Sequence, residues 1–380
     1  MLFPRLAQHL LRFLARVTLA RERPLIIAVT GSVGKTTTKE AIYTVLAHRY
    51  GSRVSVSRSN LNNEFGVPLS ILGMESAPGR WQYPAVLARG FVAALTARRP
   101  ALRPIRVQEL GAERPGDIAY LVAFLKPYLA LGVVTTIGPI HLNRGQFSSV
   151  AGIEQEKGML VEALPEDGWA VLNKDNPATR RMGKRTRAKV VWFNDRGIDT
   201  HIEIARAVGK IYGLKEQEIR RALQTFHRPT GRLNEFAGMK GVVVIDDSYN
   251  ANPMSMQEAL SLLGNRPGRR IAVLGDMLEL GDRERLYHQQ VGKLARGRSD
   301  VVVGVGNRAR WYEGTYHFAT PLLTASFLKK FVQVGDTVLV KGSQGMRMEL
   351  VSAALLANPS DVEKLPRQTL AWKGKPFVQP

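Results

Sequence analysis

The stretch VTGSVGKTTT, from Val29 to Thr38, decides how this chain folds. It starts within the apolar run Leu25–Thr30, which predicts a buried strand, and it leads into the helical segment Lys35–Ala47. Glycines between a strand and a helix let backbone amides approach phosphate oxygens, and the N-terminus of the helix adds partial positive charge. The stretch therefore predicts a phosphate-binding loop.

The side chains of this loop suit a nucleoside triphosphate. Lys35 can reach the β- and γ-phosphates, and the Thr36 hydroxyl can hold a magnesium ion. The spacing is shorter than the common G-x-x-x-x-G-K-[ST], because Val29 stands where the first glycine would be. We expect seven consecutive residues to bind the nucleotide: Gly31, Ser32, Val33, Gly34, Lys35, Thr36 and Thr37.

Strands and helices alternate along the rest of the chain in two series. Buried apolar strands separated by helices favour a mostly parallel sheet in an α/β domain. The expected strands of the first series are 105–109, 130–137 and 170–172, and its helices are 115–125 and 150–163. The expected strands of the second series are 242–246, 271–274, 301–303 and 337–340, and its helices are 255–263, 283–296 and 345–356.

The boundary between the two series is marked by a proline and a glycine beside charged residues, near 226–232. We therefore expect three parts. Residues 1–23 form a basic amphipathic helix, 24–228 form a P-loop-type ATPase domain with a mostly parallel sheet, and 229–380 form a Rossmann-like α/β domain. Both α/β parts have the size of ordinary domains.

The composition excludes some kinds of site and points to anionic partners. The 380 residues include no cysteine, so disulfides and thiolate metal sites are excluded. A metal must then have oxygen or imidazole ligands, which suits magnesium. The net charge of +22 attracts phosphates, nucleic acid or anionic lipid alike. No basic motif of a known nucleic-acid-binding module is present, so we expect no nucleic-acid partner.

The N-terminal segment has apolar residues at helical spacing among arginines. Arg12 and Arg16 interrupt the apolar core that a secretion signal requires, and the segment is too charged to span a bilayer. Two alternatives stay open, an interfacial helix on anionic lipid or a helix packed on the protein's own body. The segment Pro84–Arg99 has the same apolar and basic character. The apolar positions are Phe3, Leu6, Leu10, Phe13, Leu14 and Val17.

The form TG-x-x-GKT resembles the phosphate loop of the Mur ligases and of the related folylpolyglutamate synthases. Further motifs extend the resemblance to Mur ligases over most of the chain. In order they are SNLNNEFGVP (59–68), VQELGAERPGDI (107–118), GPIHL (138–142), EQEKGMLVEALPEDGWAVLNKDNP (154–177), GRLNEF (231–236), IDDSYNANPMSM (245–256), AVLGDMLELG (272–281) and VLVKGSQGMRME (338–349). IDDSYNANP together with GDMLELG favours the family members that add D-alanyl-D-alanine to a nucleotide-linked cell-wall peptide.

This resemblance implies an ATP- and Mg²⁺-dependent ligase of peptidoglycan synthesis. Such an enzyme transfers the γ-phosphoryl group of ATP to a carboxylate, here that of a muramoyl peptide. An amine, here that of D-alanyl-D-alanine, attacks the acyl phosphate and gives the amide, ADP and phosphate. Phosphoryl transfer needs charge neutralisation and alignment above all. The resemblance also implies a cytoplasmic monomer, and contact with the inner face of the membrane stays open.

The resemblance assigns the metal site to Thr36, Glu109, His141 and Lys157. Glu109 ends a predicted strand, where open α/β sheets bind ligands. Lys157 alone looks like a solvent-facing helix lysine, but in the family the matching lysine is carbamylated by carbon dioxide, which turns a cation into an anionic oxygen ligand. Lys35, His141, Lys157 and Arg232 are the expected catalytic residues.

Further assignments by resemblance concern the nucleotide and the substrates. Arg232 is expected to reach the ATP phosphates, and Asp247 the ribose. For the two asparagines of NLNN, a turn-capping role is an equal alternative. The side chains expected at the substrate are Asn62, Asn63, Tyr249, Asn250, Asn252, Lys341 and Ser343.

Two departures from the family pattern bear on the substrate. The phosphate loop begins near residue 30, so the usual N-terminal domain for the uridine nucleotide is expected to be lacking. The uridine end is then held otherwise, or the acceptor differs and is lipid-linked. The family's H-N-x-x-N motif, whose asparagine binds adenine, is also absent, and His201 lies roughly at its place.

Two alternative functions follow from these departures. One is a related ligase with a different acceptor, such as an enzyme that glutamylates folate or polymerises amino acids. The other is a non-catalytic nucleotide-binding scaffold for other cell-wall enzymes.

Overall fold

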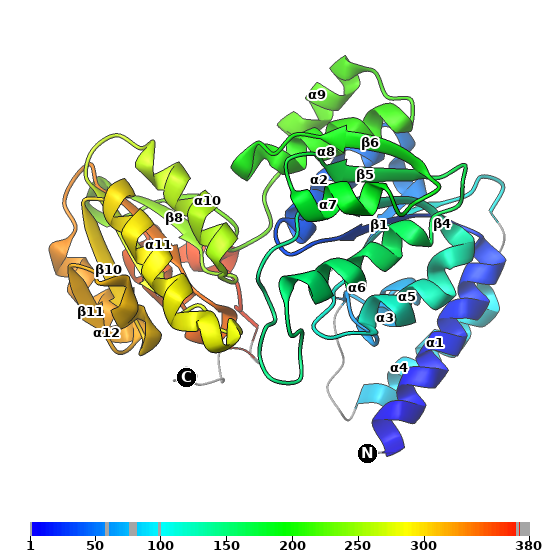
Figure 1. The fold of residues 1–380 in the computed structure, drawn as a ribbon, viewed down its shortest axis with the longest axis horizontal. Helices are drawn as coiled ribbons and strands as arrows, with labels where there is room; N and C mark the ends of the chain where they lie inside the picture. Colours follow the sequence, from blue (N-terminus) through cyan, green and yellow to red (C-terminus); the bar gives the residue numbers. More distant parts are fainter. Residues whose placement is uncertain (1, 58–60, 76–81, 98–99, 370–371, 373–380) are drawn as a thin grey trace. The chain divides into compact units, whose positions relative to one another are not determined.

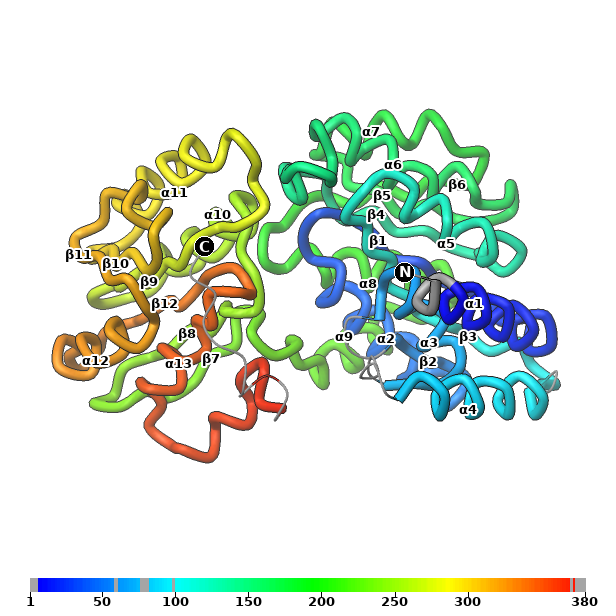
Figure 2. Tube along the Cα trace, turned by 90° about the horizontal axis from the view of Figure 1, so that it is seen from below, coloured from blue at the N-terminus to red at the C-terminus, as the bar shows by residue number. Residues whose placement is uncertain are grey.

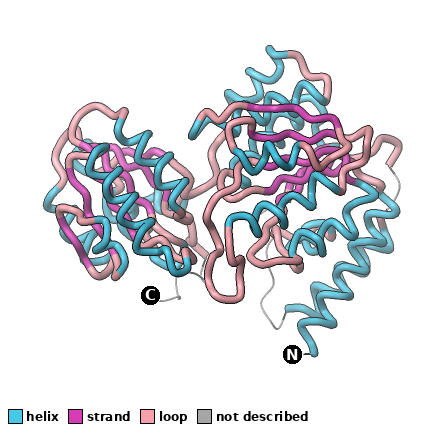
Figure 3. The backbone as a smooth tube through the Cα atoms, in the orientation of Figure 1, coloured by secondary structure: helices cyan, strands magenta, loops and turns pink. Residues whose placement is uncertain are grey.

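Two compact units make up the structure, a computed structural model that describes residues 2–57, 61–75, 82–97, 100–369 and 372. Unit 1 comprises 1–138 and 145–226, and unit 2 comprises 139–144 and 227–380. Each unit has its own sheet with helices on both faces (Figures 1 and 3). Ser59 of the predicted asparagine motif, Arg99 and the side chain of Phe3 lie outside the described residues.

Unit 1 is built on a six-stranded parallel sheet in the order β2-β3-β1-β4-β5-β6. The predicted strand Leu25–Thr30 is the central β1, and its residues Ile26 to Val29 are fully buried, as both faces of the sheet are covered. The strand order reverses at β1, between β3 and β4, and open α/β sheets bind ligands beyond the carboxyl ends at such a point. The other strands are β2 Val54–Val56, β3 Ile105–Glu109, β4 Leu129–Val134, β5 Trp169–Asn173 and β6 Lys189–Phe193.

Helices cover both faces of this sheet (Figures 1 and 2). On one face, α2, α8 and α9 share a core with the strands. On the other face, α6 packs on β1 and β4 with α5 and α7 beside it. Their bounds are α2 Lys35–Tyr50, α3 Gly66–Ile71, α5 Asp117–Leu125, α6 Val150–Glu162, α7 Pro177–Gly183, α8 Thr200–Ile211 and α9 Glu216–Gln224.

The N-terminal helix α1 (Leu2–Glu22) packs against α4 (Tyr83–Thr96) and α3. Its buried stripe includes Leu11, Leu14 and Leu19, so the alternative of a helix packed on the protein's own body is confirmed. The predicted apolar face is only partly buried, because Leu6, Leu10 and Phe13 are exposed. Each helix in the described part of the chain is too short or too polar to span a bilayer.

Unit 2 has a six-stranded sheet in the order β11-β10-β9-β12-β8-β7, parallel except for β7. Helices α10 and α11 cover one face and α12 and α13 the other. The strands are β7 Asn234–Ala237, β8 Val243–Asp247, β9 Arg270–Gly275, β10 Val301–Val305, β11 Tyr316–Phe318 and β12 Thr337–Lys341. The helices are α10 Pro253–Gly264, α11 Glu284–Arg298, α12 Pro321–Phe331 and α13 Glu349–Leu355.

The two predicted α/β sheets are thus confirmed, with shifts of a few residues at most ends. The largest shift is at the last helix, predicted to begin at 345, which begins at Glu349. The preceding turn requires Arg347 at a φ of 54°, in the left-handed region, and this ends any helix that starts before it.

Candidate phosphate-binding and metal site

The loop between β1 and α2 adopts a backbone that depends on its two glycines. Gly31 has a φ of 144° and Gly34, the N-cap of α2, a φ of 80°. A Cβ on Gly31 would collide with the Thr135 side chain at the end of β4. No side chain caps the N-terminus of α2, so its first amides remain available to an anionic ligand.

Hydrogen bonds hold this loop against the segment that follows β4. The Ser32 hydroxyl donates to the Gly138 carbonyl (3.1 Å) and accepts from the Gly138 amide (3.0 Å). The Thr135 hydroxyl donates to the Val33 carbonyl (2.5 Å). The side chain of Ser32, expected at the nucleotide, is therefore used to position the loop, and the nucleotide would meet the loop's backbone.

A cluster of oxygen ligands assembles beside the loop from three separate segments. The Thr36 hydroxyl donates to Glu109 Oε2 (2.9 Å), and Asn62 Nδ2 donates to Glu109 Oε1 (2.9 Å). Glu109 ends β3 and is only 3% exposed. Lys35 Nζ donates to the Gly31 carbonyl (2.8 Å), which keeps the ammonium over the loop.

Lys157, on α6, is fully buried (0% exposed), and its amine has no hydrogen-bond partner within the described part of the chain. Burial first, and then the positive charge of Lys35, lower the pKa of Lys157 to about 7, while Glu156 and Glu109 act in the opposite direction. The reading of Lys157 as a solvent-facing lysine is wrong. An amine with such a pKa is uncharged in about half of the molecules near neutral pH.

A contact of the neighbouring residue Glu156 explains in part why the Lys157 side chain is buried. Its carboxylate accepts hydrogen bonds from the amides of Gly116 (2.8 Å) and Ile118 (2.6 Å) at the N-terminus of α5. This contact fixes the rotation of α6, so that the next residue, Lys157, is turned into the interior. Sequence reasoning missed this role of Glu156, although acidic residues are favoured at helix N-termini.

The residues present fit a magnesium ion. A hydroxyl and a carboxylate are the hard oxygen ligands that Mg²⁺ prefers, and Mg²⁺ usually takes its remaining ligands from water and substrate phosphates. No group of three or more His, Cys, Asp or Glu side chains that could hold a metal ion is found among the described residues. Thr36 and Glu109 are the pair that would hold the ion.

His141, the other predicted metal ligand, belongs to the short segment 139–144 of unit 2. Its Nδ1 lies 2.6 Å from Glu279 Oε2, and the Leu142 amide donates to the Glu279 carbonyl (3.0 Å). His141 has a φ of 52°. The GPIHL and GDMLELG motifs, far apart in the sequence, are therefore neighbours, which the spacing of the motifs did not reveal.

The two predicted substrate asparagines of NLNN have different roles. Asn62 orients Glu109, as described above. Asn63 Oδ1 accepts from the amides of Gly66 (2.8 Å) and Phe65 (3.3 Å) at the start of α3. For Asn63 the structure thus shows the turn-capping alternative.

In unit 2, a buried ion pair joins the ends of two neighbouring strands. Lys341 Nζ, at the end of β12, donates to Asp247 Oδ2 (2.6 Å) and to the Asn250 carbonyl (2.9 Å). Burial raises the pKa of Asp247, whereas the charge of Lys341 lowers it. The Arg232 guanidinium lies 4.5 Å from the centre of the Tyr249 ring. These four predicted site residues, Arg232, Asp247, Tyr249 and Lys341, lie in one region of unit 2.

The side chains of three other predicted substrate residues accept hydrogen bonds from backbone amides. Asn250 Oδ1 accepts from the Ala251 amide (2.9 Å), and Asn252 caps α10 by accepting from the Ser255 amide (3.0 Å). The Ser343 hydroxyl accepts from the Leu278 amide (2.8 Å). These side chains shape the loops around the Asp247–Lys341 pair.

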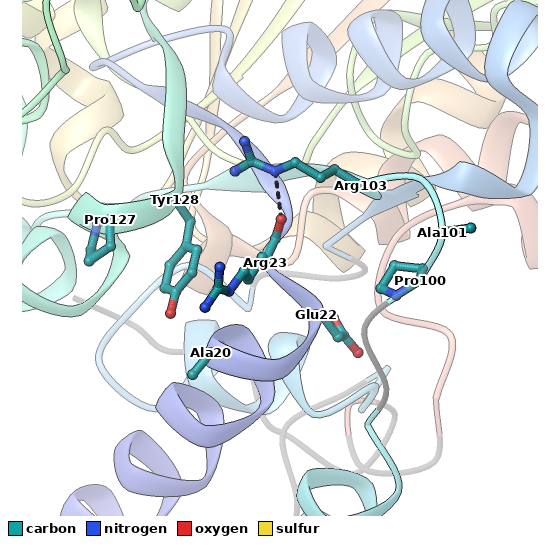
Figure 4. Close-up of a pocket in the computed structure, with 8 residues that line it drawn as sticks. All are labelled: Ala20, Glu22, Arg23, Pro100, Ala101, Arg103, Pro127 and Tyr128. Atoms are coloured by element: carbon teal, nitrogen blue, oxygen red, sulfur yellow. Dashed lines mark hydrogen bonds between the residues drawn. The ribbon is translucent and has the colours of Figure 1, made fainter.

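A pocket of about 490 Å³ lies elsewhere, at the C-terminal end of α1 (Figure 4). There, Arg103 Nε donates to the Arg23 carbonyl (2.8 Å). No predicted site residue lines this pocket. Its lining is Ala20, Glu22, Arg23, Pro100, Ala101, Arg103, Pro127 and Tyr128.

Comparison with known proteins agrees with these motifs. The Mur ligase middle domain matches residues 29–80 and 101–235, and the Mur ligase glutamate ligase domain matches 231–344. A UDP-N-acetylmuramoyl-tripeptide–D-alanyl-D-alanine ligase from Synechocystis is 30% identical, over 89% of this chain and 76% of that protein. The protein of the same name from Escherichia coli is 29% identical, over 88% and 77%.

Solved structures give the same result. The MurF ligase of Thermotoga maritima in complex with ADP has a TM-score of 0.75 and 26% identity, and the match covers 94% of this chain and 84% of that one. A bifunctional folylpolyglutamate synthase/dihydrofolate synthase has a TM-score of 0.64 at 18% identity, over 90% and 93% of the two chains, and shares the fold. The chain belongs to the Mur ligase family, the ATP-dependent ligases that form amide bonds.

Proposed function

We propose that this protein uses ATP and Mg²⁺ to join D-alanyl-D-alanine to the carboxylate of a UDP-N-acetylmuramoyl tripeptide. These are the substrates after which its relatives from Synechocystis and Escherichia coli are named. The observation that carries the chemistry is the Thr36–Glu109 contact beside the buried amine of Lys157. The enzyme acts as a cytoplasmic monomer on small-molecule substrates.

Several residues of unit 1 would each have a separate role in phosphoryl transfer. Lys35 neutralises the β- and γ-phosphates, and amides of the loop other than that of Ser32, which donates to the Thr136 carbonyl, contact their oxygens. Thr36 and Glu109 hold Mg²⁺, which when bound supplies positive charge to the transferred group. Asn62 keeps the Glu109 carboxylate in place through its hydrogen bond.

Lys157 would act as a further metal ligand after carbamylation. Its uncharged amine attacks the carbon of CO₂ and loses one proton to water, leaving an N-carboxylate with one negative charge. This change turns a buried group without a partner into an oxygen ligand for a hard cation. His141 is proposed as the ligand of a second metal ion.

The residues of unit 2 are given roles by the resemblance to the Mur ligases. We assign the ribose of ATP to Asp247 and the phosphates to Arg232. Tyr249, Asn250, Asn252, Lys341 and Ser343 form the loops beside the substrates. The three parts 1–23, 24–228 and 229–380 remain our proposed domain division.

Phosphate release from ATP tests this function. It is measured with the UDP-linked tripeptide and D-alanyl-D-alanine together, with each omitted, and with folate and glutamate instead. We expect turnover only with both cell-wall substrates, and a loss of at least about 100-fold in Glu109→Gln. Nucleotide binding without turnover would favour the scaffold, and turnover with folate and glutamate would favour the related ligase.

A further inference from the structure

Helices α1 and α4 carry an unusual number of exposed apolar side chains. On α1, Leu6 is 68% and Phe13 61% exposed, with Leu10 between them at 40%. On α4, Phe91 is 56% and Leu95 55% exposed, and Val92 beside them is exposed to the same degree. Scattered single exposed residues are ordinary, but a contiguous apolar surface marks an interaction site.

These residues form one exposed stripe on each helix. Both stripes run along the line where α1 and α4 pack together, here called the seam. Leu6, Leu10 and Phe13 follow helical spacing, as do Phe91 and Leu95. The helices pack together through a shared core that includes Leu11, Leu14 and Ala94, and α3 also joins this core. Figures 1 and 2 show α1 and α4 lying along each other in unit 1.

The seam is held at its C-terminal end by polar contacts. Arg21 Nη1 donates to the carbonyls of Ala94 (2.9 Å) and Leu95 (2.6 Å), at the end of α4. This places the two stripes in a fixed relation, since both helices are anchored by the core as well. The exposed stripes border the shared core, since Phe13 precedes Leu14 and Leu95 follows Ala94.

The charges around the stripes have one sign. Arg16 on α1 and Arg89 on α4 are exposed. Arg16 is three residues from Phe13 and Arg89 is three residues from Val92, so each arginine neighbours an exposed apolar side chain of its own helix. Glu22, at the last position of α1, is the only acidic residue in the sequence of either helix. An apolar stripe with a basic border matches the interface of a bilayer with anionic headgroups.

This charge pattern distinguishes a bilayer from a second copy of the chain. Two copies that met at these stripes would bring arginines near arginines, and like charges across an interface cost binding energy. Anionic headgroups instead pair with the guanidinium groups, and the net charge of +22 adds long-range attraction. Both helices also pack in a core of unit 1, so the contact would be peripheral.

We propose that the α1–α4 face is a peripheral membrane-binding surface that selects anionic phospholipid. Leu6, Leu10, Phe13, Phe91 and Leu95 enter the boundary between headgroups and acyl chains, and Arg16 and Arg89 contact the phosphates. Such a surface would hold the enzyme at an anionic bilayer. It is independent of the ligase site, because it shares no residue with it.

Vesicle flotation of the full chain tests this proposal. The probes are phosphatidylcholine vesicles with and without phosphatidylglycerol. We expect flotation with the anionic vesicles only, weakened by salt. Phe13→Ser/Phe91→Ser and Arg16→Gln/Arg89→Gln should each weaken binding about tenfold or more. The control is Leu322→Ser/Leu323→Ser, on equally exposed apolar residues of α12, and should bind as the wild type.

Activity and thermal stability serve as controls for folding of the variants. Phosphate release and the melting temperature should be unchanged in all three variants, which shows that they fold. The proposal is overturned if the wild type does not float with anionic vesicles, or if the α12 control loses binding to the same extent. It is also overturned if sedimentation shows a dimer that Phe13→Ser/Phe91→Ser dissociates while lipid binding is absent.

Discussion

Lys157 shows how much one residue depends on its surroundings. A lysine in water carries a proton up to a pH above ten, whereas burial and the neighbouring charge of Lys35 lower the pKa of this amine to about 7. The amine therefore titrates in the physiological range. Perturbed groups of this kind concentrate at functional sites.

Lys157→Ala should reduce phosphate release at least about 100-fold, because the proposed metal ligand is lost. Short carboxylic acids such as acetate should restore part of the activity by supplying the missing oxygens. In the wild type, activity at limiting CO₂ should fall below pH 7, where the amine is protonated and does not react. The measurement is steady-state phosphate release over a pH series.

The exposed Lys210 on α8, as Lys210→Ala, is the matched control and should stay active. Full activity of Lys157→Ala without any added acid would refute the carbamate role.

At the scale of elements, the turn from β1 to α2 depends on Gly31. Gly31→Ala should destabilise unit 1 by about 2–4 kcal/mol. The new Cβ would collide with Thr135, and alanine rarely adopts the φ of 144° that this position has. Nucleotide affinity should fall with it. Chemical denaturation and titration with ATP measure the two effects.

Gly197→Ala is the control for backbone strain alone, since Gly197 has a φ of 59° but open space around its Cβ position. It should cost only about 1 kcal/mol and leave ATP affinity unchanged. Equal losses in the two variants would contradict the collision with Thr135.

Strand β8 ends in two aspartates whose environments differ. Asp247 pairs with Lys341, whereas Asp246 accepts from the Ser352 hydroxyl (2.6 Å) and its other oxygen has no partner among the described residues. Burial raises the pKa of Asp246 to about 6. The folded state thus binds a proton more tightly than the unfolded state, so stability falls as the pH rises from about 4 to about 6.

Asp246→Asn should remove this dependence. Between pH 5 and pH 7 the wild type should lose about 1 kcal/mol of unfolding free energy more than the variant. Urea unfolding at both pH values measures the difference, with the exposed Asp282→Asn as control. A variant with the same pH dependence as the wild type would show that Asp246 titrates normally.

At the scale of the whole molecule, each unit has cores of its own. The sheet of unit 1 packs on α2, α8 and α9, and that of unit 2 is covered on both faces by its four helices. In unit 2, Glu349 is buried between Arg347 and Arg367, with Arg367 Nη1 donating to Glu349 Oε2 (2.7 Å). Removing one member of such a group leaves a buried charge without its partner.

Calorimetry should therefore resolve two unfolding transitions. Glu349→Ala should destabilise one by about 3–5 kcal/mol, and Gly31→Ala should affect the other. A single transition that both variants lower would contradict independent units.

Local patterns in the sequence predict most of this architecture. The sequence predicts β1 and β3 from their apolar runs, because a strand buried on both faces requires consecutive apolar residues. It predicts the turn after β1 from its glycines, because a tight turn requires them at particular positions. Edge strands such as β11 were missed, since short, half-exposed strands carry a weak pattern, whereas α9 was missed although its pattern is amphipathic.

Tertiary structure alone decided how the chemical groups are used. Which segments meet determines that Lys157 is buried, that Ser32 and Asn63 bind backbone groups, and that His141 meets Glu279. It also decided which flank of α1 stays exposed. A sequence fixes the type and order of its side chains, but solvent access, pKa and hydrogen-bond partners come from residues distant along the chain.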